Sequence, residues 1–441
     1  RRVLFRSPDG NWAGQGDFTN FPAILEDGGS RLTNKNDLWN TITMKLTPIK
    51  GMSINMDYTF NYYSENNKVH MKSFDEYGAN GQFLQTFAWT NPNSVSQSQA
   101  NDTYNAFNFF GDYEKTLGKH YLKGMIGYNQ ESKHTTGFNA GREQLISNDL
   151  GSLSYATGDR WVGSSDNSWA TRSGFFRINY GYDERYLLEV NGRYDLSSKF
   201  PKHDRAVFNP SFSAAWRLSN ESWFKSWTNS FFDELKIRGS YGLVGSDETG
   251  LSAGAQHFLY IDQVSLNNIG FTTGVDMNYT LYGPLVTNYA VVNGGWERVK
   301  KLDIGIDLEL FRQLTITADY FNEKRYNILL HREAWPESLG YYTAKPWSNK
   351  GKVDNWGIEL SVNWRKEFTK DLYVDFRGNF TYTENKYVNL DEPVYPYVWK
   401  TSTGKPLSRT TGYIAQGLIS SQEEIDNSPT QNLGSTVKPG D

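Results

Sequence analysis

The sequence predicts an all-β fold: a transmembrane, antiparallel, up-and-down β-barrel, of which about twelve strands lie in these 441 residues. About twelve segments alternate apolar and polar residues, and the connections between them are alternately short and long. Mean hydropathy is only −0.64, as expected when half of each strand faces a wet lumen. A helical membrane protein is excluded, because no run of about eighteen apolar residues exists to span the bilayer.

Met52–Tyr62 is the clearest strand, with apolar residues at even positions and polar residues at odd positions. Side chains of a strand point to opposite faces with a period of two, so one face of this strand is apolar and the other is polar. We expect the following residues to face lipid: Ile54, Met56, Tyr58, Ile358, Leu360 and Phe376. We expect three carboxylates, Asp57, Glu359 and Asp375, to face the lumen.

Tight turns join the alternating segments into hairpins. The pairs are 37–46 with 52–62, 104–113 with 121–128, 302–310 with 314–320, and 356–364 with 372–382. The intervening segments are long and rich in Asn, Ser, Gly and aromatic residues: 64–102, 131–168, 245–297 and 327–354. In an outer-membrane barrel the short turns are periplasmic and the long loops extracellular, which orients the chain.

A soluble β-sandwich or jelly roll also alternates and is the alternative reading. Two details favour the barrel. Charged residues recur on the polar face, as in Asp303, Asp307 and Glu309, and are rare on the apolar face. Trp356 and Trp364 stand on one face at the two ends of a strand, a spacing that fits the aromatic girdles at the two lipid–water interfaces.

Composition excludes several classes of function. The net charge is −4 with mixed signs, so we predict no nucleic-acid partner. Cysteine is absent, which excludes disulfides and Cys-based zinc sites and fits a cell-envelope protein. The six histidines are scattered, so we predict neither a metal site nor a cofactor.

No catalytic constellation stands out. Asp303 and Asp307 share a strand face and could form a glycosidase pair, but charges recur on every lumen face, which favours contact with a plug or water. Gly245–Gly250 is glycine-rich yet lacks the lysine and helix of a phosphate loop. We therefore predict a protein that is not an enzyme.

Five ordered blocks carry a resemblance to a known family. The longest, Phe176–Phe200, reads FRINYGYDERYLLEVNGRYDLSSKF. The others are Phe208–Trp216, Leu235–Gly245, Asn349–Leu360 and Gly412–Ile425. Together they resemble the barrel of SusC/RagA-type TonB-dependent transporters of Bacteroidetes. Leu196 is a small departure, because the family usually has glycine there.

The resemblance implies a barrel of about 22 strands around a plug, neither of which is complete in this chain. We expect residues 1–7 to be a non-native leader and residues 8–441 to be part of the barrel, without the plug. Implied partners are a SusD-like surface lipoprotein, the TonB–ExbB–ExbD complex acting through the plug, and outer-membrane lipid.

The resemblance implies an importer of oligosaccharides or peptides in the outer membrane of a Gram-negative, Bacteroidetes-like cell. The alternatives are a passive porin and a secreted glycan-binding β-protein. Aromatic side chains stack on sugar rings, so the candidates for substrate contact are loop aromatics. They are Trp161, Trp169, Trp335, Tyr341 and Tyr342.

Overall fold

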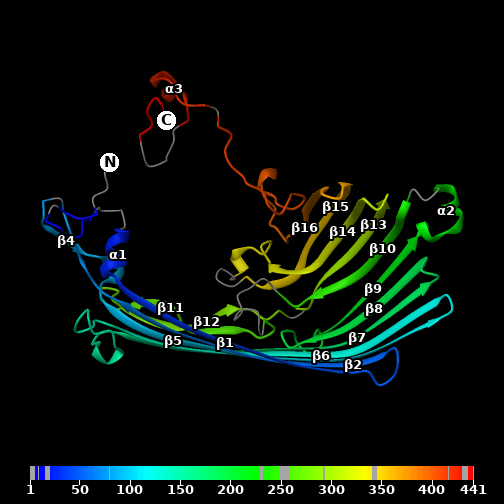
Figure 1. Ribbon diagram of the computed structural model, residues 1–441. Helices are drawn as coiled ribbons and strands as arrows, with labels where there is room; N and C mark the ends of the chain where they lie inside the picture. The colour runs from blue at the N-terminus through cyan, green and yellow to red at the C-terminus, as the bar shows by residue number, and fades with distance from the viewer. Residues whose placement is uncertain are drawn as a thin grey trace.

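A single antiparallel sheet of twelve strands dominates the fold (Figure 1). The computed structural model describes residues 5–7, 9–14, 20–78, 80–228, 232–248, 259–291, 294–339, 345–415, 417–429 and 436–440. Strand order follows chain order, β1-β2-β5-β6-β7-β8-β9-β10-β13-β14-β15-β16. This confirms the up-and-down meander. Among the described strands, β1 and β16 each pair on one side only, so the sheet is a curved, open barrel wall.

The sheet strands differ about twofold in length. They are β1 (Gly29–Leu46), β2 (Met52–Met71), β5 (Ser94–Leu117), β6 (His120–Glu143), β7 (Arg160–Tyr182), β8 (Tyr186–Ser197), β9 (Ala206–Arg217), β10 (Phe232–Ser246), β13 (Glu297–Leu310), β14 (Leu314–His331), β15 (Trp347–Thr369) and β16 (Leu372–Asn389). Outside the sheet, the described residues form two hairpins and three short α-helices. They are β3 (Asp75–Tyr77) with β4 (Phe83–Thr86), β11 (Gln263–Thr273) with β12 (Tyr279–Asn288), α1 (Phe21–Asp27), α2 (Ser222–Thr228) and α3 (Gln422–Asn427).

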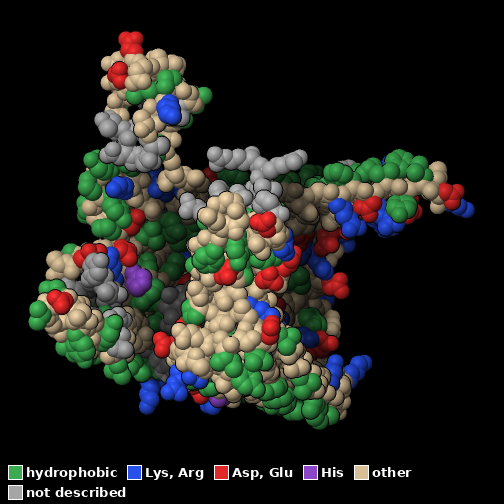
Figure 2. All heavy atoms as spheres, turned by 90° about the vertical axis from the view of Figure 1, so that its left-hand side faces the viewer, with side chains coloured by type: hydrophobic (Ala, Val, Ile, Leu, Met, Phe, Trp, Pro, Cys, Tyr) green, Lys and Arg blue, Asp and Glu red, His purple; other side chains and the backbone are tan. Residues whose placement is uncertain are grey.

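The register separates an apolar from a polar face, because directly paired residues of neighbouring strands share a face. One row across five strands reads Ile237, Ile306, Ala318, Leu360 and Phe380. The adjacent row reads Arg238, Gly305, Asp319, Glu359 and Thr381. Figure 2 shows apolar side chains on the outer surface of the layer at upper right and charged ones on its inner surface. The structure therefore confirms that the residues expected to face lipid and the carboxylates expected to face the lumen lie on opposite faces of the sheet.

The two edges of the sheet differ as the hairpin pattern predicts. One edge carries the short turns 47–51, 118–119, 183–185, 311–313 and 370–371. In the turn 183–185, Asp183 and Glu184 both have positive φ, 51° and 54°, as a type I′ hairpin turn requires. Two connections depart from the pattern. The β8–β9 connection on the long-loop edge is only residues 198–205, and the β9–β10 connection on the short-turn edge carries α2.

Most strands extend beyond the alternating segments, and here the sequence prediction was wrong. Residues expected in long loops belong to strands: β2 continues to Met71, β6 continues to Glu143, and β7 begins at Arg160. Beyond the bilayer both faces of a strand meet water, so alternation disappears while the backbone ladder continues. Trp161 and Trp169 accordingly lie on β7 and not in a loop.

The long-loop edge has small cores of its own. Trp12, Ala23, Phe74 and Phe87 form one cluster, which joins α1 to the connection that carries β3 and β4. Val95, Leu145 and Ala156 form a second, which joins β5 to the β6–β7 connection. Among the described residues, no helix has the length and apolar character to cross a bilayer. These cores make the long connections a folded surface above the barrel wall.

Candidate functional site

The lumen face carries an ion-pair network centred on Arg238 of β10. Its guanidinium nitrogens lie 3.1 Å from Asp303, 3.3 Å from Asp307 and 2.6 Å from Asp319. Lys236 adds a contact of 2.9 Å to Asp307. Alternation places all of these side chains on one face, where each partly buried charge finds a partner. Asp303 and Asp307 share one arginine, so we assign them to this network and not to a glycosidase pair.

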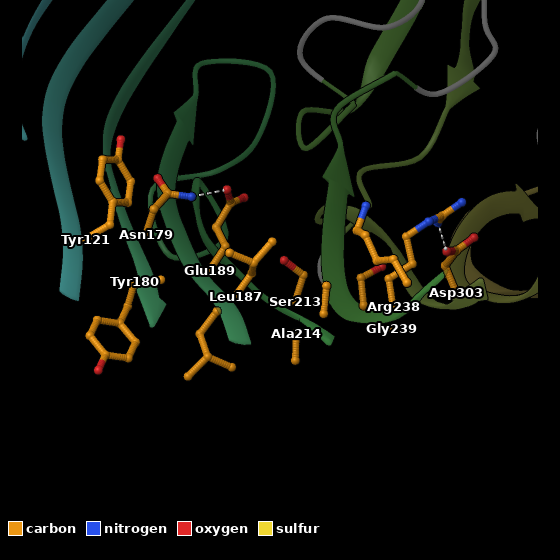
Figure 3. Close-up of a pocket in the computed structure, with 15 residues that line it drawn as sticks. Tyr121, Asn179, Tyr180, Leu187, Glu189, Ser213, Ala214, Arg238, Gly239 and Asp303 are labelled. Atoms are coloured by element: carbon orange, nitrogen blue, oxygen red, sulfur yellow. Dashed lines mark hydrogen bonds and ion pairs between the residues drawn. The ribbon is translucent and has the colours of Figure 1, made fainter. Parts of the chain in front are cut away.

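A hollow of about 580 Å³ lies beside this network on the same face, next to the short-turn edge (Figure 3). Strands β6 to β10 and β13 line it with Tyr121, Asn179, Glu189, Ser213, Arg238 and Asp303. In Figure 3 Tyr121, Asn179 and Glu189 point to one side of the sheet, and Tyr180 points to the other. The hollow therefore offers polar and charged groups to a polar occupant of the lumen.

An aromatic row crosses the lumen face nearer the middle of the long strands. Trp39 of β1, Tyr104 of β5 and Trp169 of β7 have ring centroids 6.1 and 6.4 Å apart in succession. Register explains the row, because Trp39 pairs with Asn61, Asn61 with Tyr104, Tyr104 with Lys133, and Lys133 with Trp169. The Lys199 ammonium lies 5.6 Å from the Trp169 ring centroid. The row presents aromatic faces beside a cation.

Sequence reasoning found Trp169 but missed Trp39 and Tyr104. The sequence did contain a signal: Trp39 lies at an odd-numbered position, on the same face as the polar residues Asp37 and Thr41. An aromatic side chain on the lumen face does not contact lipid, so another role, such as substrate contact, could have been considered.

The remaining candidates do not join this row. Trp161 shares its strand and face with Trp169 but lies eight residues away, about 26 Å along an extended strand. Trp335 lies in the β14–β15 connection, where the Arg332 guanidinium sits 5.0 Å from its ring centroid. Tyr341 and Tyr342 lie outside the described residues. The structure thus separates the three described candidates, Trp161, Trp169 and Trp335, instead of gathering them into one site.

The described histidines and carboxylates contain no group of three or more that could hold a metal ion. Two histidines contact one carboxylate each: His134 Nε2 lies 2.9 Å from Asp166 Oδ1, and His203 Nε2 lies 3.1 Å from Asp204 Oδ2.

The outer face carries aromatic residues along the short-turn edge. His120, Tyr182, Tyr186 and Trp216 follow one another across four strands with ring centroids 5.0, 6.4 and 6.2 Å apart. Trp356 packs on Tyr382 of the neighbouring strand at 5.8 Å, and Trp364 lies on the same face eight residues along β15. These rings match the girdles expected at the edges of an apolar band.

Twelve meandering strands with an apolar outer face and a charged inner face form the wall of a transmembrane-type β-barrel. The chain belongs to the family described as TonB dependent receptor-like, beta-barrel, whose profile matches residues 2–422.

Its relatives are receptors of Bacteroidetes. The chain is 26% identical over 407 residues to the TonB-dependent receptor SusC of Bacteroides thetaiotaomicron, covering 86% of this chain and 38% of that protein. It is 27% identical over 308 residues to TonB-dependent receptor P3 of Formosa agariphila, covering 69% and 29%. The chain thus spans about a third of the length of the curated relatives it matches.

A solved structure of the RagAB peptide transporter has the same fold. It superposes with a TM-score of 0.67 at 19% identity, covering 82% of this chain and 38% of that one. At this identity the likeness shows the fold alone.

Proposed function

We propose that the protein containing this chain is a SusC-like, TonB-dependent importer. It takes up oligosaccharides or peptides across the outer membrane together with a SusD-like surface lipoprotein. The observation that carries this proposal is the pairing of an amphipathic barrel wall with a folded long-loop edge, in a chain of the TonB-dependent receptor family.

The long-loop edge is the evidence for a lipoprotein partner. A stable interface buries well over 1,000 Å², and the connections 72–93, 144–159, 247–296 and 332–346 are long enough to supply it. After β16 the chain returns to this edge, so Gly412–Ile425 also belongs to the extracellular side. The loops and the lipoprotein would enclose the substrate between them.

The polar lumen face of the wall is the evidence for the proposed transport step. A plug packed inside the barrel needs polar partners, and the hollow beside Arg238 offers Asn179, Glu189 and Ser213. TonB, with ExbB and ExbD, would then act on the plug, while Trp39, Tyr104 and Trp169 contact the passing substrate. Trp161, near the start of β7, and the loop residues Trp335, Tyr341 and Tyr342 remain candidates for substrate contact. Catalysis has no place in this scheme.

A pull-down tests the two-component scheme. Tagged full-length protein is extracted from membranes in mild detergent, and the co-purifying chains are identified by mass spectrometry. We expect a SusD-like lipoprotein in near-equal amount. Recovery of the receptor alone, under conditions that preserve known complexes of this type, would favour a stand-alone TonB-dependent receptor.

Two other functions predict different results. A passive porin gives steady ion conductance in planar bilayers and uptake that survives loss of TonB. A secreted glycan-binding β-protein stays in the aqueous phase of a detergent partition and shows no heat-modifiable migration on a gel. We expect detergent-phase partition and TonB-dependent uptake.

A further inference from the structure

Helix α2 interrupts the short-turn edge, where every other connection between sheet strands is only two to five residues long. It exposes two large aromatic side chains one turn apart: Trp223 is 55% exposed and Trp227 is 78% exposed. Between them in sequence, Phe224 is only 5% exposed. With about 100° per residue, the two tryptophans share one side of the helix and Lys225 lies on the opposite side.

Phe224 ties α2 to the apolar outer face of the sheet. Its ring centroid lies 5.5 Å from that of Phe232, the first residue of β10. The register of β10 against β13 shifts between Phe232 and Glu234, and Phe232 pairs with Leu310. Leu310 belongs to the lipid-facing series of β13, so this β-bulge turns Phe232 outward as well. The helix is therefore attached to the lipid-facing surface at its short-turn edge.

Glu221, immediately before α2, ties the helix to the aromatic row of the outer face. Its carboxylate, 6% exposed, accepts hydrogen bonds from the Tyr186 hydroxyl at 2.7 Å, the Trp216 indole at 3.1 Å and Arg185 at 2.8 Å. The Tyr186 hydrogen bond, followed by those from Arg185 and Trp216, holds the pKa of this carboxyl below its usual range. Tyr186 and Trp216 are the last two rings of the row that begins at His120.

We propose that α2 is an interfacial anchor, whose Trp223 and Trp227 insert among the phospholipid headgroups of the inner leaflet beside the aromatic row. Tryptophan favours this zone because its ring is apolar and its N–H is polar. We take the partner of Trp223 and Trp227 to be lipid because α2 and the aromatic row lie on the same outer face of the sheet. The anchor fixes the depth of the barrel wall at the point where its periplasmic connection is longest.

Spin-label accessibility tests the anchor in the full-length protein. The chain has no cysteine, so W223C, W227C or the control K225C introduces the one labelled position in this region, with any cysteine elsewhere replaced by serine. Each nitroxide-labelled variant is reconstituted into phosphatidylethanolamine and phosphatidylglycerol vesicles. Heat-modifiable migration confirms that each variant is folded.

Collision rates with oxygen, which concentrates in lipid, are compared with those for a water-soluble nickel chelate. We expect the oxygen-to-nickel ratio at positions 223 and 227 to be several-fold higher than at position 225. Equal, water-like ratios at all three positions would overturn the proposal and place α2 in the periplasm. Protection from both reagents at 223 and 227 would also overturn it and indicate a protein partner on this side of the helix.

Discussion

Arg238 and Asp319 form an ion pair across an intervening strand. Arg238 lies on β10 and Asp319 on β14, with β13 between them, yet Nη2 of Arg238 lies 2.6 Å and 2.9 Å from the two carboxylate oxygens. Gly305 makes this possible, because it is the residue of β13 that pairs with both. A Cβ at Gly305 would lie 2.7 Å from the Arg238 guanidinium carbon and closer still to the Asp319 carboxylate.

Substituting Gly305→Ala should therefore break this ion pair by overpacking. We expect a loss of about 1–3 kcal/mol in the free energy of unfolding, measured by urea titration of the full-length protein in vesicles. Gly239→Ala is the control, since a Cβ there meets only a backbone oxygen at 3.7 Å. An equal loss in both variants would mean that strand glycines matter for backbone reasons and not for the ion pair.

Leu360 and Ser361 are adjacent residues on opposite faces of β15, so they test which face meets lipid. Leu360→Arg should cost roughly 2–4 kcal/mol of folding free energy, because it buries a charge at mid-bilayer. Ser361→Arg, whose side chain enters the polar lumen, should cost far less. The measurement is equilibrium refolding into vesicles. A larger loss for Ser361→Arg would reverse the assignment of the two faces.

Acidification should loosen the β6–β7 connection where it packs on His70, which lies near the end of β2 above the bilayer. Burial, followed by the nearby Lys72 and Lys68 charges, lowers the pKa of this imidazole below 6.5. Above about pH 6.5 the His70 imidazole is neutral whether the β6–β7 connection is docked or undocked, so it does not change the stability of docking. As pH falls from there toward the folded-state pKa, the undocked form binds the proton first and docking weakens.

Hydrogen exchange at residues 145–156, corrected for intrinsic pH dependence, measures this loosening. His70→Leu should remove the pH dependence. Undiminished protection of the wild type at pH 5.5 would show that protonated His70 is accommodated, for instance through Asp149, whose charge favours the protonated form.

The aromatic row gives a prediction about substrate affinity. If Trp169 stacks on a sugar ring, Trp169→Ala should weaken oligosaccharide binding about tenfold, which corresponds to about 1.4 kcal/mol. Trp169→Phe keeps an aromatic face and should retain most of the affinity. Calorimetry with the full-length receptor and its lipoprotein measures both. Unchanged affinity in Trp169→Ala would mean that the row only packs the lumen wall.

Purified full-length protein should leave oligosaccharides and peptides uncleaved, because Asp303 and Asp307 are engaged by Arg238. Product analysis after long incubation is the check. Cleavage at enzyme-like rates that disappears in Asp303→Asn or Asp307→Asn would give these carboxylates the catalytic role rejected above.

The amino-acid sequence by itself determined the faces of the strands. Ile358, Glu359 and Leu360 alternate, and since lipid and water lie on opposite sides of a barrel wall, this alternation settles which side each residue meets. The short hairpins were equally readable, because their turns lie between two alternating segments.

Only the tertiary structure decided features that depend on pairing between strands. The strands rise beyond the bilayer, where water on both faces leaves no periodic signal, so Trp161 and Trp169 belong to β7. Trp39, Tyr104 and Trp169 become neighbours through the register of five strands, and Phe232 turns outward through a single bulge. Such placements depend on backbone hydrogen bonds between distant segments, and those bonds leave no mark on the local order of residues.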